Sequence, residues 1–476
     1  MMVEVSGRVL GQAVEQYDTH YPQPGWAEQN PEDWLAAFCA TAKAALATSG
    51  LGPSQVVSIG ISGITHTAVL LDENDQVLPP VLHMFDTRCG TEVGELNARF
   101  RQRFGHECFN GCSSLWTYPQ LLWIRKNCPG VWRRVRHVLF PKDYVRHRLA
   151  PGYVTDYIDA DGTLFYNPIK REWIADFIAD LGLPAGVWPR TCAPTEIVAQ
   201  LSSRGAVLSG LMTGTPFIAG TTDTAAEVLG CGAVRPGDAV VKLASVGRLA
   251  FITREPMWQP GMITYPHVLD GLWYPGTAAK HAASAYKWLR QVFWPSGEPA
   301  PPDAFARMDA RAAQAPSGCD GLVFLPHLAG AWSPVWDDAR EAAFCGVRAR
   351  HQQAHFARAV LEGVAFSLKS AWRSLEAAGM EATNLRLIGA GARSSLWREI
   401  VADVIGRPLV VPVETEAVRG TALLTAMGVG ALPQKAEAVL AQVGAAAEIT
   451  PQPERVRQYE ELFSRYEKFE TALAPR

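Results

Sequence analysis

Three segments of the sequence combine glycine with small or hydroxyl-bearing residues at the predicted ends of strands. They are residues 220–223, 243–247 and 389–395. Backbone N–H groups approach a phosphate closely only where side chains are small, and consecutive N–H groups in a turn form an anion-binding concavity. The three segments therefore predict a site for a polyphosphate. Each one alone is weak evidence, because hairpin turns and close helix–strand packing use the same residues.

The first segment ends in Asp223, which follows the apolar strand expected at 215–219 and opens the next helix. A carboxylate in that position can accept the proton of a hydroxyl group as its oxygen attacks phosphorus. Aspartate in this setting more often serves as a plain helix N-cap. The local sequence alone favours the N-cap.

The other two segments suit different parts of a nucleotide. The turn at 243–247 lies between two predicted strands, where Ser245 and nearby amides could hold a transferring phosphate. The turn at 389–395 lies between a strand and a helix, and its small residues leave room for an adenosine ring or a ribose against the backbone. The candidate nucleotide-binding residues of the two turns are Ala244, Ser245, Gly247, Gly389, Ala390, Gly391, Ala392 and Ser395.

The elements that must position these segments alternate between apolar strands and helices in both halves of the chain. Residues 56–61 form a continuous apolar run that predicts a buried strand, and residues 355–378 have helical periodicity. A charged, amphipathic helix is expected at 453–473. This alternation indicates two α/β domains, which we place at 1–228 and 229–476. A chain of 476 residues also exceeds what one hydrophobic core normally supports.

Composition narrows the class of partner. Hydrophobic residues make up 48% of the chain and charged residues 19%, and the formal net charge is −3 without a basic block, which argues against nucleic acid. No apolar run approaches the ~20 residues of a membrane helix, and the start carries no apolar leader. The nine cysteines lack metal-site spacing. We therefore expect a cytoplasmic protein with reduced thiols that acts on small molecules and does not bind membranes.

A fourth pattern is more specific. Gly346-Val347, His355-Phe356 and the run at 359–362 are spaced as in the second signature of the FGGY carbohydrate kinase family. The sequence resembles this family from about residue 6 to about residue 430, and its pentulose and pentitol kinases in particular. Residues 23–29, 141–144 and 155–156 also look like family segments.

The resemblance implies a fold and an activity. The fold would be two actin-like ATPase (ribonuclease H-like) domains around a central cleft. The activity would be transfer of the γ-phosphate of ATP to a hydroxyl of a ketose or polyol, with D-xylulose as the leading candidate and xylulose 5-phosphate as its product. The implied cofactors are ATP and Mg²⁺, and the family allows a homodimer.

The resemblance also assigns roles to single residues. Asp223 would be the general base and a contact of Mg²⁺, the turn at 244–247 would be the second phosphate loop, and the segment at 389–397 would hold adenosine. The implied sugar contacts are His66, Asp86, Arg88 and Thr224.

Departures from the family pattern bear on the identity of the sugar. Ile64-Thr65 stands before His66 where xylulokinases usually have Gln-Met, and Met84-Phe85 stands before Asp86 where they have Trp-Asn. Two polar sugar contacts are thus replaced. The phosphate turn has Ala244 and Ser245 where Gly-Thr is usual.

The largest departure lies at the start. Family members open with a strand and an Asp-x-Gly-Thr phosphate loop, and no such loop precedes Ser6-Gly7 in this chain. We therefore expect the first domain, as written, to lack its first strand and phosphate loop. We also expect the natural chain to begin roughly 15–20 residues earlier, the length of two short strands and a turn.

Two other functions remain open. The first is a non-catalytic sugar-binding or regulatory homologue that has lost the first phosphate loop, and ATP consumption in the presence of pentuloses and pentitols separates it from a kinase. The second is an actin-like ATPase with a protein partner, which is weaker because His66, Asp86 and Arg88 would then have no purpose.

Overall fold

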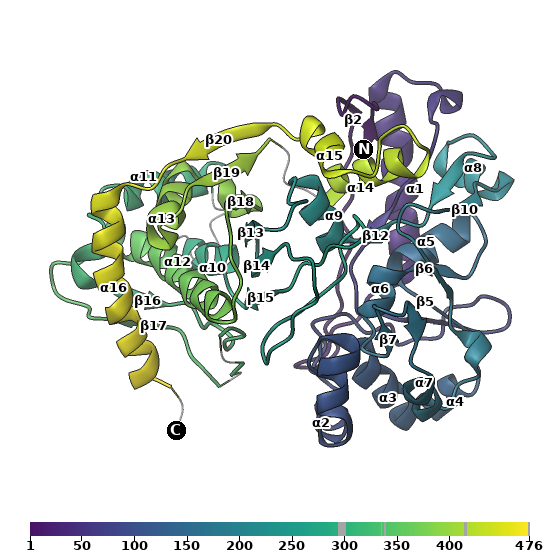
Figure 1. Ribbon diagram of the computed structural model, residues 1–476, viewed down its shortest axis with the longest axis horizontal. Coiled ribbons are helices and arrows are strands. Elements are labelled where there is room, and N and C mark those ends of the chain that lie inside the picture. The colour runs from purple at the N-terminus through teal and green to yellow at the C-terminus, as the bar shows by residue number, and fades with distance from the viewer. Residues whose placement is uncertain (294–300, 335, 338, 414–416, 475–476) are drawn as a thin grey trace.

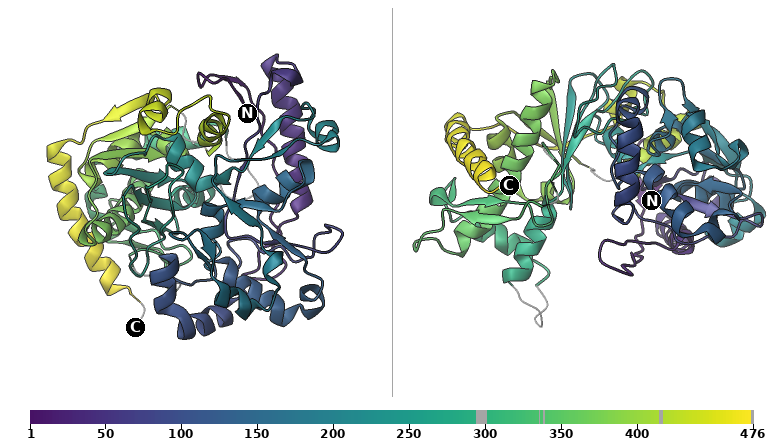
Figure 2. Two further views of the ribbon diagram at one scale, coloured as in Figure 1. Left: turned by 45° about the vertical axis from the view of Figure 1, so that its right-hand side comes forward. Right: turned by 90° about the horizontal axis from the view of Figure 1, so that it is seen from below.

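Two α/β lobes lie side by side in the computed structural model (Figures 1 and 2). The structure describes residues 1–293, 301–334, 336–337, 339–413 and 417–474. Strands and helices alternate in both lobes, as the sequence predicts. Within the described ranges no helix is long and apolar enough to cross a membrane.

A six-stranded sheet forms the centre of the second lobe. The strands β13, β18 and β19 run parallel to one another, and the remaining pairs are antiparallel. In spatial order the strands are β15 (Gly276–Ala279), β14 (Gly247–Phe251), β13 (Asp238–Leu243), β18 (Asn384–Ile388), β19 (Leu409–Pro412) and β20 (Ala445–Ile449).

Helices cover this sheet and complete the core of the second lobe. They are α10 (Ala283–Phe293), α11 (Ala304–Ala312), α12 (Gln353–Ala377), α13 (Ser395–Ile405) and α16 (Pro453–Ala472), with a separate pair of strands, β16 (Val323–Leu325) and β17 (Ala343–Cys345). The amphipathic face of α16 is buried on α12. There Glu362 accepts hydrogen bonds from Tyr459 Oη at 2.7 Å and from Arg358 Nε at 2.7 Å. Glu362, the last residue of the run at 359–362, therefore joins α12 to α16.

The first lobe is built from short two-stranded ladders. The pairs are β1 (Met2–Val3) with β2 (Val9–Gly11), β3 (Ser62–Gly63) with β12 (Thr221–Thr222), β4 (Val69–Leu71) with β5 (His137–Leu139), β6 (Val154–Asp156) with β9 (Arg190–Cys192), β7 (Tyr166–Asn167) with β8 (Glu172–Trp173), and β10 (Ile197–Gln200) with β11 (Pro216–Ile218). The helices packed on them are α1 (Pro31–Ser49), α2 (Gly90–Arg103), α3 (Thr117–Asn127), α4 (Pro129–Trp132), α5 (Pro141–Leu149), α6 (Tyr157–Asp161), α7 (Ala175–Leu181), α8 (Ser203–Ser209) and α9 (Asp223–Gly230).

The strand expected at 56–61 is wrong for most of its length. Within it, Ile59 alone makes a bridge, to Phe217, and regular pairing begins at β3. A cavity of about 390 Å³ lies between residues 1–5 and residues 55–62. Strand β1 borders the same cavity, but it pairs with β2, and no ladder joins it to 56–61 among the described residues.

The two lobes share chain segments. Helices α14 (Ala417–Gly428) and α15 (Ala436–Gln442) come late in the sequence, yet Leu424 and Val439 belong to the core of the first lobe. Tyr265, from the stretch between β14 and β15, belongs to the same core. The domain boundary between 228 and 229 stays a prediction, because these crossings join the two sides.

A buried ion cluster holds the middle of the first lobe. Lys142 Nζ lies 2.8 Å from Asp143 Oδ1, 3.0 Å from Asp156 Oδ2 and 3.3 Å from Asp159 Oδ2, and all four side chains are buried. Burial lowers the pKa of Lys142, but the three carboxylates outweigh it and raise this pKa overall. Burial raises the pKa of Asp159 to about 7. The lysine therefore compensates the buried charges of Asp156 and Asp159, while Asp143 also lies 3.5 Å from Arg146 Nη2.

We expect Lys142→Met to destabilise the first lobe, because it leaves the buried carboxylates of Asp156 and Asp159 without their cation. Breaking a buried ion set by removing one partner costs about 3–5 kcal/mol. In scanning calorimetry this corresponds to a fall of roughly 6–20 °C in the Tm of that lobe. Lys170→Met is the matched control, since Lys170 is exposed. Equal Tm values for the two variants would show that the cluster contributes little.

Candidate active site

Asp223 is the first residue of α9, but it is not the cap of that helix. The cap is Thr222, whose Oγ1 accepts a hydrogen bond from Ala225 N at 3.2 Å. Asp223 Oδ1 accepts from Thr224 N at 2.7 Å and from Thr224 Oγ1 at 3.3 Å. The plain N-cap that the local sequence favours is therefore wrong. Among the described residues, the second carboxylate oxygen of Asp223 accepts no hydrogen bond.

An ion pair fixes α9 to the strand that leads into the candidate phosphate turn. Glu227 lies one helical turn after Asp223, on the same face of α9. Its carboxylate is 2.6 Å from Lys242 Nζ, two residues before the turn begins at Ala244. The ion pair thus holds α9 beside the strand that enters the turn at 244–247.

The turn at 244–247 presents amides and hides carbonyls. Ala283 N donates to Ala244 O at 2.8 Å, and both Ala282 N and Ser284 Oγ donate to Ser245 O, at 3.0 and 2.7 Å. The backbone amides of Ala244, Ser245 and Val246 donate no hydrogen bond to any described residue. Neighbouring free amides in a turn form an anion-binding concavity. The Ser245 side chain is exposed beside them.

The glycine turn at 389–391 packs directly on this phosphate turn. Gly389 has φ +90°, and a Cβ added there would lie 2.7 Å from Leu243 O. The two turns meet because β13 and β18 are parallel neighbours, so their carboxyl ends lie together. Close packing therefore accounts for Gly389 and Gly391. It also places Ala390, Ala392 and Ser395, the other residues predicted to hold adenosine, beside the phosphate turn.

His66 is held in a strained backbone conformation by hydrogen bonds on both ring nitrogens. Its φ is +68°, a region that non-glycine residues rarely adopt outside functional sites. Nδ1 lies 2.8 Å from Gly162 O, and a carbonyl only accepts, so Nδ1 carries the proton and Nε2 accepts from Tyr265 Oη at 2.8 Å. Burial lowers the pKa of His66 to about 4. The ring is therefore neutral at pH 7.

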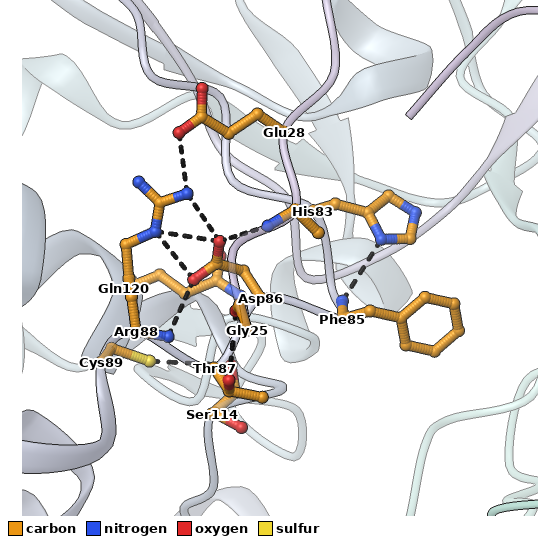
Figure 3. A network of polar contacts seen from close by, with 11 residues as sticks. Gly25, Glu28, His83, Phe85, Asp86, Thr87, Arg88, Cys89, Ser114 and Gln120 are labelled. Atoms are coloured by element: carbon orange, nitrogen blue, oxygen red, sulfur yellow. Dashed lines mark hydrogen bonds and ion pairs between the residues drawn. The ribbon is translucent and has the colours of Figure 1, made fainter. Parts of the chain in front are cut away.

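Asp86 and Arg88 form a buried network with residues 25–28 (Figure 3). Asp86 accepts from Ala27 N at 2.7 Å and from Arg88 Nε at 2.9 Å. Arg88 Nη2 reaches Glu28 at 2.7 Å, and its guanidinium stacks on Trp26 at 3.6 Å. These contacts hold the segment after the first hairpin in place. Contact of Asp86 and Arg88 with a sugar stays a prediction.

The sequence analysis did not identify two residues that lie near His66. Tyr265 bonds to the imidazole, and Arg248 contributes to lowering the pKa of His66, so its charge lies close to that ring. Arg248 carries a detectable signal, because it is the one charged residue within the apolar strand β14. Tyr265 lies in a stretch without regular secondary structure, where hydrophobic periodicity gives no signal.

The donor set near Asp223 fits a magnesium ion bound mainly through nucleotide phosphates. No cluster of three or more His, Cys, Asp or Glu side chains suited to a metal occurs among the described residues. Mg²⁺ usually binds one or two carboxylates, with waters and substrate phosphates completing its shell. The second oxygen of Asp223 suits such a role.

Comparison with known proteins places the chain in a family. Residues 1–230 match the N-terminal domain, and residues 250–429 the C-terminal domain, of the FGGY family of carbohydrate kinases. The chain is 31% identical to a xylulose kinase from Escherichia coli (strain K12) over 414 residues, covering 86% of this chain and 83% of that protein. It is 26% identical to a gluconokinase from Bacillus subtilis (strain 168) over 460 residues, covering 94% and 88%.

Solved structures agree on the fold. The crystal structure of xylulose kinase from Rhodospirillum rubrum matches with a TM-score of 0.86 and 29% identity, covering 96% of this chain and 93% of that chain. The predicted fold, two actin-like ATPase domains, is confirmed. The matches also confirm an enzyme of the carbohydrate kinase class, similar to xylulose kinases. The chain therefore belongs to the FGGY family of carbohydrate kinases.

Proposed function

We propose that this protein transfers the γ-phosphate of ATP to a hydroxyl of a ketose or polyol, with Asp223 as the general base and D-xylulose as the first substrate to test. One observation carries the proposal. A carboxylate that the helix cap does not use stands at the start of α9, and Glu227 ties that helix to the strand entering a turn with free amides.

The chemistry that these residues can perform is direct. Asp223 accepts the proton of the sugar hydroxyl while its oxygen attacks the γ-phosphorus in line. The amides at 244–246 and the Ser245 hydroxyl stabilise the phosphoryl oxygens as their charge is redistributed. Thr224 orients Asp223 through two hydrogen bonds. When bound, Mg²⁺ supplies additional neutralisation of the phosphate charge.

We propose that His66, Asp86 and Arg88 contribute to binding the sugar. Because His66 is neutral and its Nε2 accepts from Tyr265, a sugar hydroxyl that bonds to Nε2 must replace the tyrosine hydroxyl as donor. The relatives named xylulose kinases support D-xylulose as substrate. We further propose a reducing, cytoplasmic setting, since the structure has all nine cysteines as free thiols.

A non-catalytic sugar-binding role remains the second candidate. A cavity of about 390 Å³ borders residues 1–5, beside residues 56–61, which form no regular strand. Coupled assay of ADP formation with D-xylulose, D-ribulose, xylitol and arabinitol separates the two candidates. Sugar binding with no ADP formation for any of them would favour the non-catalytic role.

We expect Asp223→Asn to lower kcat by about 10²–10⁴, the usual contribution of a general base. Sugar binding measured by calorimetry should change little, because the amide keeps the shape and the hydrogen-bond acceptor. Glu73→Gln is a suitable control, since Glu73 is exposed. Wild-type turnover in Asp223→Asn would show that another group takes the proton.

We expect Gly389→Ala to impair ATP use. The new Cβ would meet Leu243 O at 2.7 Å and must displace the phosphate turn. A misplacement of about 1 Å can cost about 10² in rate, so kcat/KM for ATP should fall by that order. The matched control is Gly379→Ala, because Gly379 also has a positive φ (+87°) but has nothing within 4 Å of the added Cβ. An equal, small effect of both substitutions would separate the glycine turn from the nucleotide site.

A further inference from the structure

Arg248 lies one residue after the phosphate turn, on the face of the sheet that is turned toward the first lobe. Along β14, Leu249 and Phe251 belong to the core of the second lobe, whereas Ala250 belongs to the core of the first lobe. Side chains alternate between faces along a strand, so Arg248 shares the face of Ala250. In the sheet it stands directly opposite Lys242.

The guanidinium of Arg248 is partly enclosed and has no partner for one of its edges. Nε and Nη2 are both buried, and neither makes a hydrogen bond. Within the described ranges no carboxylate pairs with Arg248, whereas Glu227 lies 2.6 Å from Lys242. Two cations directly opposite on neighbouring strands repel each other. Among the described residues, Glu227 is the one carboxylate that forms an ion pair with either cation, and it pairs with Lys242.

The unpaired edge has the geometry of an oxyanion receptor. The Nε–H and Nη2–H groups point in parallel and match two oxygens of one carboxylate or phosphoryl group. Arg103 uses the same edge within this chain, binding Glu107 Oε1 through Nε at 2.5 Å and Glu107 Oε2 through Nη2 at 3.1 Å. An unmade hydrogen bond at a buried polar group is unfavourable, and more so at a charged group. A ligand that fills this edge of Arg248 would remove that penalty.

The surroundings of Arg248 are those of the proposed active site. Its guanidinium carbon lies 5.8 Å from the ring centre of Tyr265, which bonds to His66, and 5.7 Å from the ring centre of Tyr274. Burial raises the pKa of Tyr274, and the hydroxyl of Thr222 opposes this rise, so Tyr274 lies beside the residue that precedes Asp223. Arg248 thus lies near the tyrosine that bonds to His66 and near the tyrosine beside Thr222, the residue before the proposed base.

We propose that Arg248 binds an oxyanion of a bound reactant through its Nε–H and Nη2–H groups. This inference rests on the proposed function and names a further residue of the same site. Two sources carry such an oxyanion: the carboxylate of a sugar acid used as the acceptor, and the phosphoryl group of ATP that is being transferred. Arg248 would select the acceptor in the first case, and would stabilise the transferring group in the second.

The test compares wild type with Arg248→Met, which keeps the length of the side chain without charge, and with Arg248→Lys, which keeps the charge without the paired donors. The acceptors are D-gluconate, its uncharged counterpart D-glucitol, and D-xylulose, each with ATP. Arg204→Met serves as the control, because Arg204 is exposed. Among the described residues Arg248 makes no hydrogen bond or ion pair, and its contacts are with the rings of Tyr265 and Tyr274, so the Tm of Arg248→Met should fall little. If that variant does not fold, Arg248→Lys carries the test.

Kinetics distinguish the two sources. A carboxylate on Arg248 predicts that Arg248→Met lowers kcat/KM for D-gluconate by about 10²–10³, the effect of losing an oxyanion donor, and leaves D-xylulose unchanged. A phosphoryl group on Arg248 predicts an equal fall in kcat for every acceptor with sugar KM unchanged. Arg248→Lys should recover little in either case, because a lysine cannot make the paired contact. Unchanged kcat and KM on all three acceptors in both variants would overturn the proposal.

Measuring ligand binding tests the role of Arg248 even if the enzyme does not turn over. If the wild type forms no ADP with any acceptor, the proposed function fails, and calorimetric titration with D-gluconate and with ATP then decides the role of Arg248. At least tenfold weaker binding of either probe to Arg248→Met supports the oxyanion site. Equal binding of both probes to wild type and variant contradicts it.

Discussion

The parallel pairing of β13 with β18 is the constraint on which the candidate site depends. It brings the ends of both strands to one place, so that Gly389 packs against the backbone at 243–244. Only a residue without a side chain fits between the two turns. The ion pair between Glu227 and Lys242 then attaches the helix that starts at Asp223 to the same strand end. Positions far apart in the sequence are thereby joined through one sheet edge.

Much of this arrangement is predictable from local patterns. The strands at 238–243 and 384–388 are apolar runs, and the long helix at 353–377 repeats its apolar positions with helical spacing. The spacing of Gly346, His355 and Glu362 identifies the family. The structure adds that Glu362 fastens α12 to α16, so this part of the signature has a role in stability.

The features that the sequence did not predict correctly share a physical cause. Each of them depends on the neighbours of a segment and not on the segment's own residues. Residues 56–61 are apolar enough for a strand, but a strand needs a neighbour, and a cavity lies beside them. Asp223 looks like a helix cap until Thr222 is seen to fill that role. The unpaired edge of Arg248 cannot be read from sequence, because pairing is a property of the surroundings.

In the proposed reaction Asp223 faces the acceptor hydroxyl, and the amides at 244–246 face the transferring phosphate. A crystal structure with D-xylulose and a non-hydrolysable ATP analogue would show both contacts. We expect a carboxylate oxygen of Asp223 within about 2.6–3.2 Å of one sugar hydroxyl, with the terminal phosphate on the turn. A sugar bound out of reach of Asp223, or a terminal phosphate held elsewhere, would contradict it.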